Sequence, residues 1–247
     1  MGNNLLIMFN LENKGARTIG GALIISAAVF GAFYYNAQSV SQGDVLSVTG
    51  SAKETVEADQ AKLTIMLIRT VSGGVLSSGN TAIARDRGVV KTLLKKHEIE
   101  DSMIEEGVVS MYQTYTKDQE VNPYFEFRQM ITVQSSDVAK ITAISKEVPS
   151  LTAQGAIVSV GSLEYTYSKL PEKRVSLLSD AIKDAQARAQ SIAGSTGREV
   201  GNIRSASSGV VQVLPQNSIE ISDYGSYDTS SIKKDIMVTV KASFSLK

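Results

Sequence analysis

The stretch PEKRVSLLSDAIKDAQARAQSIAGST, residues 171–196, is the most strongly patterned segment of the chain. Its larger apolar residues recur at intervals of three and four, which places them on one face of a helix. Pro171 suits the first turn of such a helix, and Gly197 suits its end. We therefore predict a helix over residues 171–196 that lies close to a sheet. The residues expected on its buried face are Val175, Leu178, Ile182, Ala185, Ala189 and Ile192.

Strand patterns lie on both sides of this helix. The last twelve positions before Lys247 alternate between apolar and polar residues, which is typical of a strand with one buried face. Its apolar set is Ile236, Val238, Val240, Ala242, Phe244 and Leu246. Six other strands are predicted over residues 44–56, 61–71, 104–117, 124–135, 156–168 and 201–214. The strand over 61–71 has apolar residues on both faces and should be central.

Two further helices complete the predicted order. The first covers residues 76–97, and the second covers 137–148 with Pro149 at its end. In the first helix, Ile83, Val90, Leu93 and Leu94 are expected to be buried, and Arg85, Asp86, Lys91, Lys95 and Lys96 to face water. Residues 118–123 have turn chemistry and predict a hairpin. The order ββα ββα βα ββ predicts an α+β fold, with a mostly antiparallel sheet and helices packed on one face.

The N-terminal part of the chain differs from the rest. Residues 18–43 are 26 consecutive residues without a charge. A helix of that length rises about 39 Å, against about 30 Å for the hydrocarbon core of a bilayer. Lys14 and Arg17 precede it, and Tyr34 and Tyr35 suit its outer interface. We predict a cytoplasmic segment over 1–17, a transmembrane anchor over 18–38 that contacts the lipid bilayer through 19–35, a linker over 39–44 and one domain over 45–247.

The basic flank predicts that this anchor crosses the cytoplasmic (inner) membrane once, with the N-terminus inside and the domain facing the periplasm or extracytoplasmic space. A cleaved signal peptide and a buried soluble helix are the two alternatives. A signal peptide needs small residues at −3 and −1 of the cleavage site, and Tyr35-Asn36-Ala37 places Tyr at −3.

Composition excludes several functional classes. Lys and Arg total 25 and Asp and Glu total 25, so a strongly basic nucleic-acid binder is not expected. The chain has no cysteine, which excludes thiol nucleophiles, disulfides and cysteine-ligated metals. It has one histidine, His97, so one chain cannot form a site with several histidines. We expect no cofactor and no metal.

No motif of the sequence assembles a catalytic site. Residues 74–81, GVLSSGNT, resemble a phosphate-binding loop, but Asn80 stands where that loop needs lysine, so no nucleotide is expected. Gly73 and Gly74 then turn the chain, and Ser77 or Ser78 caps the helix. His97 is predicted at a helix C-terminus, where a cation is favoured. The chain has no Gly-x-Ser-x-Gly motif, and Glu105-Glu106 and Glu220, Asp223 and Asp228 lack the spacing of a calcium loop.

The tyrosines Tyr112, Tyr115, Tyr124, Tyr165 and Tyr167 suit half-buried strands or an interface. No catalytic, cofactor-binding or metal-binding residue is therefore assigned from the sequence.

Two stretches resemble the SIMPL-domain family of bacterial periplasmic and surface proteins. The first is Val48-Thr-Gly-Ser-Ala52 with Val56-Glu-Ala-Asp-Gln-Ala61. The second is the Ala-rich run from Ala181 to Ala193 with Gly197 and Gly201, and it is the more specific of the two. His97 lies just before Ile99, where members often have Gly-Ile, so the turn after the first helix departs from the pattern.

The resemblance implies an α+β fold and an association with the cell envelope or oxidative stress. It also implies assembly into ring-like or hollow homo-oligomers, as in some members, and it supplies no catalytic residues. We therefore expect a membrane-anchored, non-enzymatic homo-oligomer with a scaffold or stress-related role. The alternatives are a monomeric or dimeric extracytoplasmic binding module, with a ligand that the sequence does not identify, and an unrecognised hydrolase.

Overall fold

The computed structural model describes residues 29–32, 44–114, 123–218 and 224–247 of the chain. Residues 29–32 are helical, and all other residues of the predicted cytoplasmic segment and anchor lie outside the described part. Among the described residues, no helix has both the length and the hydropathy needed to cross a membrane.

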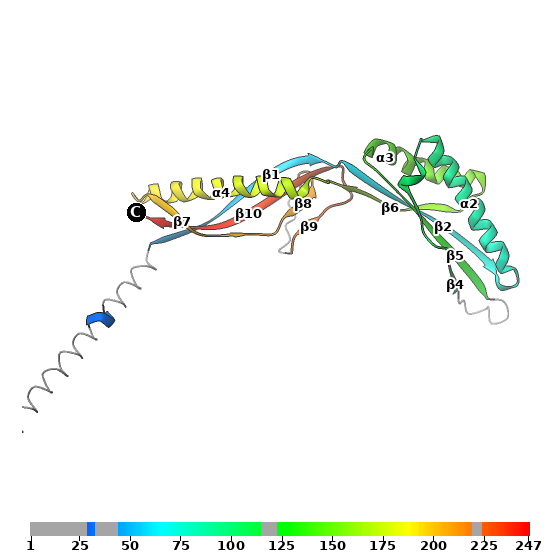
Figure 1. Ribbon diagram of the computed structural model, residues 1–247, viewed down its shortest axis with the longest axis horizontal. Coiled ribbons are helices and arrows are strands. Elements are labelled where there is room, and N and C mark those ends of the chain that lie inside the picture. Colours follow the sequence, from blue (N-terminus) through cyan, green and yellow to red (C-terminus); the bar gives the residue numbers. More distant parts are fainter. Residues whose placement is uncertain (1–28, 33–43, 115–122, 219–223) are drawn as a thin grey trace, which may run out of the picture. The chain divides into compact units, whose positions relative to one another are not determined.

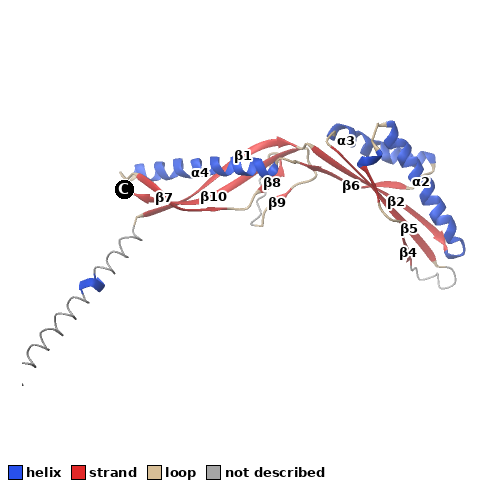
Figure 2. Ribbon diagram, in the orientation of Figure 1, coloured by secondary structure: helices blue, strands red, loops and turns tan. Residues whose placement is uncertain are grey.

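The described residues form an α+β fold with two sheets (Figures 1 and 2). Sheet A has the strand order β1-β10-β8-β9, with β7 also paired to β10. Its strands are β1 (Val45–Glu57), β7 (Val200–Ser208), β8 (Gln212–Pro215), β9 (Ser226–Tyr227) and β10 (Lys233–Leu246). Sheet B has the order β3-β5-β2-β6, with β4 also paired to β5. Its strands are β2 (Gln60–Ser72), β3 (Ile104–Glu106), β4 (Ser110–Thr114), β5 (Tyr124–Ser135) and β6 (Val158–Thr166).

The α+β class is confirmed, but the prediction of a single sheet is wrong. β1 and β2 are neighbours in the sequence and belong to different sheets, because β1 pairs with β10 whereas β2 pairs with β5 and β6. In the connection between them, the Asp59 carboxylate accepts hydrogen bonds from the backbone N–H and the hydroxyl of Ser168, both at 2.7 Å. The helices are α2 (Leu76–Lys96), α3 (Val138–Glu147) and α4 (Leu170–Ser195), which gives the order ββα βββα βα ββββ.

Sheet B is antiparallel throughout its described pairings. β2 is central and pairs with β5 from Ala61↔Ser135 to Ser72↔Tyr124, as its two apolar faces predicted. The predicted strand over 104–117 is interrupted after Glu106, and β3 and β4 each pair with β5. Thr114 faces Tyr124, so this hairpin is confirmed, while its turn at 118–122 lies outside the described residues.

α2 and α3 cover one face of sheet B (Figure 2). Leu63, Ile65 and Leu67 of β2 are fully buried in this core, and the predicted helix residues Ile83, Val90, Leu93 and Leu94 are buried with them. Asp86 was expected to face water and is instead fully buried. It lies three residues after Ile83 and four before Val90, which is the spacing of the buried helix face.

β6 contains a bulge that changes which side chains face the core. The register shifts between Thr64 and Ile65 of β2, where Gly161 is the additional residue of β6. Side chains before and after a bulge therefore differ in phase. Tyr165, after the bulge, and Val158, before it, are both buried although their numbers differ in parity, while Ile157 is exposed.

The described chain divides into two compact units. One contains residues 44–50, Ala185–Ser207 and Lys241–Lys247, and the other contains Ser51–Asp184 and Ser208–Val240. In the first unit, β1 and β10 are joined by the hydrogen bond from Leu246 N–H to the Asp44 carbonyl at 2.8 Å. In the second, Val56, Leu177, Val213, Ile236 and Val238 form a small core besides that of sheet B.

The helix over 171–196 is confirmed, but its buried face is only partly the predicted one. Ala185 and Ala189 are fully buried, whereas Val175, Ile182 and Ile192 are exposed. The buried residues recur at intervals of four and are Leu177, Ala181, Ala185, Ala189 and Ala193. Small alanine side chains let a helix approach a sheet closely, so the alanine stripe faces inward and the larger residues remain outside. In β10, the predicted residues Ile236, Val238, Val240, Ala242 and Phe244 are buried.

Candidate functional site

A buried ion pair joins β2 to α2 on the covered face of sheet B. The Arg69 guanidinium donates to both carboxylate oxygens of Asp86, through Nε at 2.6 Å and Nη2 at 2.7 Å. Arg69 Nη2 also donates to the Gly155 carbonyl at 2.6 Å, and Asp86 accepts from the Ile157 N–H at 3.3 Å. The hydrogen bond to Asp86 raises the pKa of Arg69 above its usual value. This cluster ties three segments together, and each carboxylate oxygen of Asp86 accepts a hydrogen bond from Arg69.

A second buried cation lies at the start of β10. Lys234 is fully buried, and its Nζ donates to the Asp228 carbonyl at 2.6 Å and to the Asp228 carboxylate at 3.1 Å. The hydroxyls of Ser230 and Ser231 also donate to that carboxylate. Burial alone would raise the pKa of Asp228, but these hydrogen bonds outweigh burial and hold the pKa far below its usual value. Asp228 therefore binds this loop to β10.

Asp235 forms a third internal cluster. It is almost fully buried and accepts from the Thr55 hydroxyl at 2.6 Å, from Lys53 Nζ at 3.1 Å and from the Asn217 N–H at 3.1 Å. The hydrogen bond from Thr55 is the main reason why the pKa of Asp235 is lowered. Asn217 has a positive φ of 65°, which asparagine tolerates better than most residues.

His97 ends α2, as the sequence predicted. Its backbone N–H donates to the Leu93 carbonyl at 3.2 Å and to the Leu94 carbonyl at 3.1 Å. Its Nε2 lies 2.9 Å from the Glu147 carboxylate, which also accepts from Lys96 Nζ at 3.0 Å. The hydrogen bond from Lys96 lowers the pKa of Glu147. These contacts join the ends of α2 and α3.

The glycine-rich segment at the start of α2 is a packing feature. Gly79 is buried, and a Cβ at this position would lie 2.3 Å from the Phe127 ring. The Gly73 N–H donates to the Pro123 carbonyl at 2.8 Å. This hydrogen bond continues the pairing of β2 with β5 by one residue beyond Ser72 and Tyr124. The predicted serine cap is wrong: Val75 is the N-cap residue without a side-chain cap, and the Ser78 hydroxyl donates back to the Val75 carbonyl at 2.6 Å.

The acidic candidates are separated. Glu106 accepts from Lys91 at 2.7 Å, which lowers the pKa of Glu106 and raises that of Lys91. Glu105 lies on the opposite face of β3, while Glu220 and Asp223 lie outside the described residues. Among the described residues, no group of three or more His, Asp or Glu side chains is arranged to hold a metal ion.

The predicted tyrosines fall into two environments. Tyr165 is buried, and its hydroxyl lies 2.9 Å from that of Thr142. Tyr112 and Tyr124 are exposed on β4 and β5, while Tyr167 is partly buried and Tyr115 is outside the described part.

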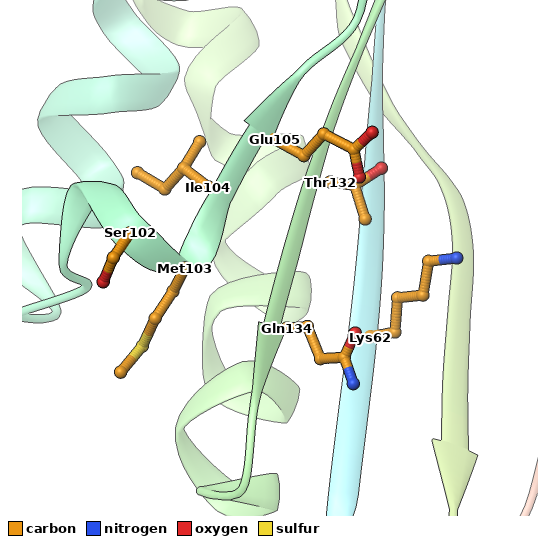
Figure 3. Close-up of a pocket in the computed structure, with 7 residues that line it drawn as sticks. All are labelled: Lys62, Ser102, Met103, Ile104, Glu105, Thr132 and Gln134. Carbon is orange, nitrogen blue, oxygen red and sulfur yellow. The ribbon is translucent and has the colours of Figure 1, made fainter.

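One open pocket of about 380 Å³ lies on the face of sheet B that α2 and α3 leave uncovered (Figure 3). Glu105 and Thr132 face each other across β3 and β5, and Lys62 and Gln134 do so across β2 and β5. Ser102, Met103 and Ile104 complete the lining. The pocket thus presents one carboxylate, one ammonium group, two hydroxyls and an amide. These groups can bind a small polar molecule, but they include neither the histidine nor a second carboxylate for acid–base work.

Sequence reasoning missed the buried charged clusters. The signals were present, since Asp86 has the spacing of the buried helix face and Lys234 has the same strand parity as Ile236. The Arg69–Asp86 and Lys234–Asp228 clusters each hold structural elements together through hydrogen bonds within the chain.

Comparison with known proteins gives one result that covers most of the chain. No curated protein matches the chain. The family model described as SIMPL, protein of unknown function (DUF541), matches residues 46–244. This match includes both stretches on which the resemblance was based. The chain therefore belongs to the SIMPL (DUF541) family of proteins of unknown function.

Proposed function

We propose that this chain is a membrane-anchored, non-enzymatic envelope protein whose SIMPL domain assembles into a ring-like or hollow homo-oligomer with a scaffold or stress-related role. The observation that supports it best is the set of exposed strand edges. Among the described strands, β6 and the pair β3 and β4 each bond to one neighbour in sheet B. Exposed edges of this kind are usually paired or covered in the working protein.

Exposed apolar side chains accompany these edges. Val108 is 84% exposed, Met111 49% and Tyr112 56%, and all three lie on or next to β4. On α4, Val175 is 69% exposed. Exposed apolar side chains along a strand edge are available for association with another chain.

The proposal assigns no catalytic group, and the contacts of the buried charged side chains support this. Arg69, Asp86, Lys234 and Asp228 bond within the domain, and His97 joins two helix ends. Their contacts are sufficient to explain why these residues are present.

The anchor and its location are supported by the sequence alone. The uncharged stretch from 18 to 43, with Lys14 and Arg17 before it, suits a single crossing of the cytoplasmic membrane with the domain outside. Deleting residues 19–35 should release the protein from the membrane fraction into the soluble fraction. A deleted protein that still requires detergent for extraction would contradict the anchor.

An extracytoplasmic binding module is the second candidate, and the pocket beside Lys62 and Glu105 favours it. The two candidates differ in mass. The binding module would be a monomer or a dimer, so we expect multi-angle light scattering of the detergent-solubilised full chain, after subtraction of detergent, to give the mass of more than two chains of 26.4 kDa each. A mass of one chain over the micromolar range would contradict assembly and favour the binding module.

A further inference from the structure

The edge of sheet B formed by β4 has an unusual composition. Residues 107–114, GVVSMYQT, contain no charged residue and no proline. Val108, Val109, Met111 and Tyr112 are all exposed. Natural edge strands are normally protected by charges, proline or a covering segment. A neutral, apolar edge of this kind is suited to pairing with another strand.

Among the described strands, β5 is the one that bonds to the backbone of β4. β4 pairs with β5 from Ser110↔Arg128 to Thr114↔Tyr124, and β5 lies between β4 and β2 (Figure 1). The Met130 carbonyl accepts from the Gly107 N–H at 2.9 Å, so the even-numbered residues of β5 direct their backbone groups to this side. In an antiparallel pair the bonded positions alternate. The N–H and C=O groups of Met111 and Gln113 are therefore directed to the free edge.

The described charges nearest β4 have partners within the chain. Glu106 bonds to Lys91, and Arg128 bonds to Glu126 while its guanidinium lies 5.9 Å from the centre of the Tyr112 ring. Along Ser110–Thr114 itself, no side chain carries a charge that could select a partner. The same neutral edge of a second copy can approach β4 without like-charge repulsion. The charge of this edge is therefore compatible with pairing between two copies of β4.

The opposite edge of sheet B is a poorer match. Tyr165 of β6 already donates its backbone N–H to the Thr229 carbonyl at 2.7 Å, which occupies one end of that edge. Glu164 adds a charge there. β4 has neither feature along Ser110–Thr114.

We propose that β4 is a subunit interface, at which β4 of one chain pairs antiparallel with β4 of a second copy across a two-fold axis. Two five-stranded sheets then continue into each other through the outward backbone groups of Met111 and Gln113. This inference rests on the proposed homo-oligomer and specifies one of its contacts. A two-fold contact closes on itself, so a larger ring would need a different second interface.

Cysteine cross-linking tests the pairing directly, because the natural chain has no cysteine. Three single variants, Met111→Cys, Tyr112→Cys and Gln113→Cys, place one thiol each along β4 of the full chain in its membrane. Near a two-fold axis, a residue faces its own copy with Cα atoms about 4.5–5.5 Å apart, which a disulfide can bridge. We expect mild oxidation to convert most of at least one variant into a dimer on non-reducing gels. Ile203→Cys, on the exposed strand β7, is the matched control and should remain a monomer.

A proline substitution tests the same contact without a covalent bond. Met111→Pro removes an outward N–H and blocks the edge, while the bonds from β4 to β5 use the even positions. We expect it to weaken self-association at least tenfold in sedimentation, with Met111→Leu as the control that keeps the N–H. Circular dichroism melting establishes that the proline variant is folded.

Each result separates this interface from the general proposal. A monomeric natural chain would contradict both. An oligomer that is unaffected by Met111→Pro and gives no dimer with any of the three cysteines would refute the β4 interface alone. Cross-linking that occurs only when Tyr112→Cys is mixed with Val160→Cys would also refute it, because β4 would then pair with β6 of the neighbour.

Discussion

Replacing Asp86 with alanine should destabilise the domain more than any surface substitution. Asp86 is fully buried, and the Arg69 side chain is 16% exposed, so the substitution leaves a largely desolvated guanidinium without its carboxylate. The two hydrogen bonds lost measure 2.6 and 2.7 Å and are charge-assisted. Each such bond contributes about 1.5–3 kcal/mol, and breaking one partner of a buried pair costs about 3–5 kcal/mol. Arg69 keeps the Gly155 carbonyl, which favours the lower half of this range.

The assay is thermal and urea unfolding of the full chain in a nonionic detergent. Far-UV circular dichroism is the suitable probe, since the chain has no tryptophan. For a protein of this size, a loss of about 4 kcal/mol lowers Tm by about 10 °C. Asp180→Ala is the matched control, because Asp180 bonds to Lys183 on the exposed side of α4 and should contribute less than about 0.5 kcal/mol.

A double substitution separates the contribution of the Arg69–Asp86 charges to stability from the contribution of their side-chain volume. Arg69→Met combined with Asp86→Leu replaces both charges with apolar side chains, and such replacements are often nearly neutral. We expect the double variant to be more stable than Asp86→Ala alone. If Asp86→Ala loses no more than Asp180→Ala, the claim that this pair fixes β2 against α2 is refuted.

Three further outcomes follow from the packing and the buried charges. Gly79→Ala should cost about 1–3 kcal/mol of stability, because the new Cβ would meet the Phe127 ring. Gly88→Ala should instead stabilise α2 by up to about 1 kcal/mol, because its Cβ has no atom within 4 Å. The urea midpoints of the two variants should therefore shift in opposite directions. Lys234→Met should cost about 3–5 kcal/mol in the same unfolding assay, because it leaves the Asp228 carboxylate without its buried cation, and a loss below about 1 kcal/mol would contradict this role. The folded-state pKa of Asp228 lies below its unfolded value of about 3.9, so its stabilisation is present above pH 4 and is lost as pH falls below 4. Melting curves from pH 7 to 2.5 should show this fall, and Asp228→Asn should melt lower at pH 7 with a flatter acid limb.

The sequence predicted local structure better than strand partners. The sequence predicts β10 from the alternation of its side chains, β2 from its apolar residues on both faces, and β5 from its position after a turn. Alternation reports which side chains share a face, but it does not report which strand lies alongside. β1 therefore appeared to belong with β2, its neighbour in sequence, although its hydrogen-bond partner is β10, far along the chain.

The buried face of α4 shows a second limit of pattern reading. Both the stripe through Val175 and Ile182 and the stripe through Ala181 and Ala185 are consistent with a helix. Hydrophobicity favours burial of the stripe through Val175 and Ile182. A short distance between the helix and sheet backbones favours burial of the alanine stripe, and the sequence does not give that distance. In the structure Ala181 is fully buried and Val175 is 69% exposed. The prediction for Asp86 fails in the same way, because its charge was given more weight than its position on the buried face of α2.

The distribution of charge connects these observations to the proposed assembly. The chain has 25 basic and 25 acidic residues, and many of those described bond to each other across elements, as in Arg69–Asp86, Lys91–Glu106 and Lys234–Asp228. Charges used in this way hold helices and loops against the sheets, so they are not available to repel or select partners at the strand edges. Association between copies would then depend on apolar contact and backbone pairing, which are short-ranged and little affected by salt. A domain with this arrangement is suited to permanent assembly, in which specificity comes from strand register and side-chain fit rather than from electrostatic steering.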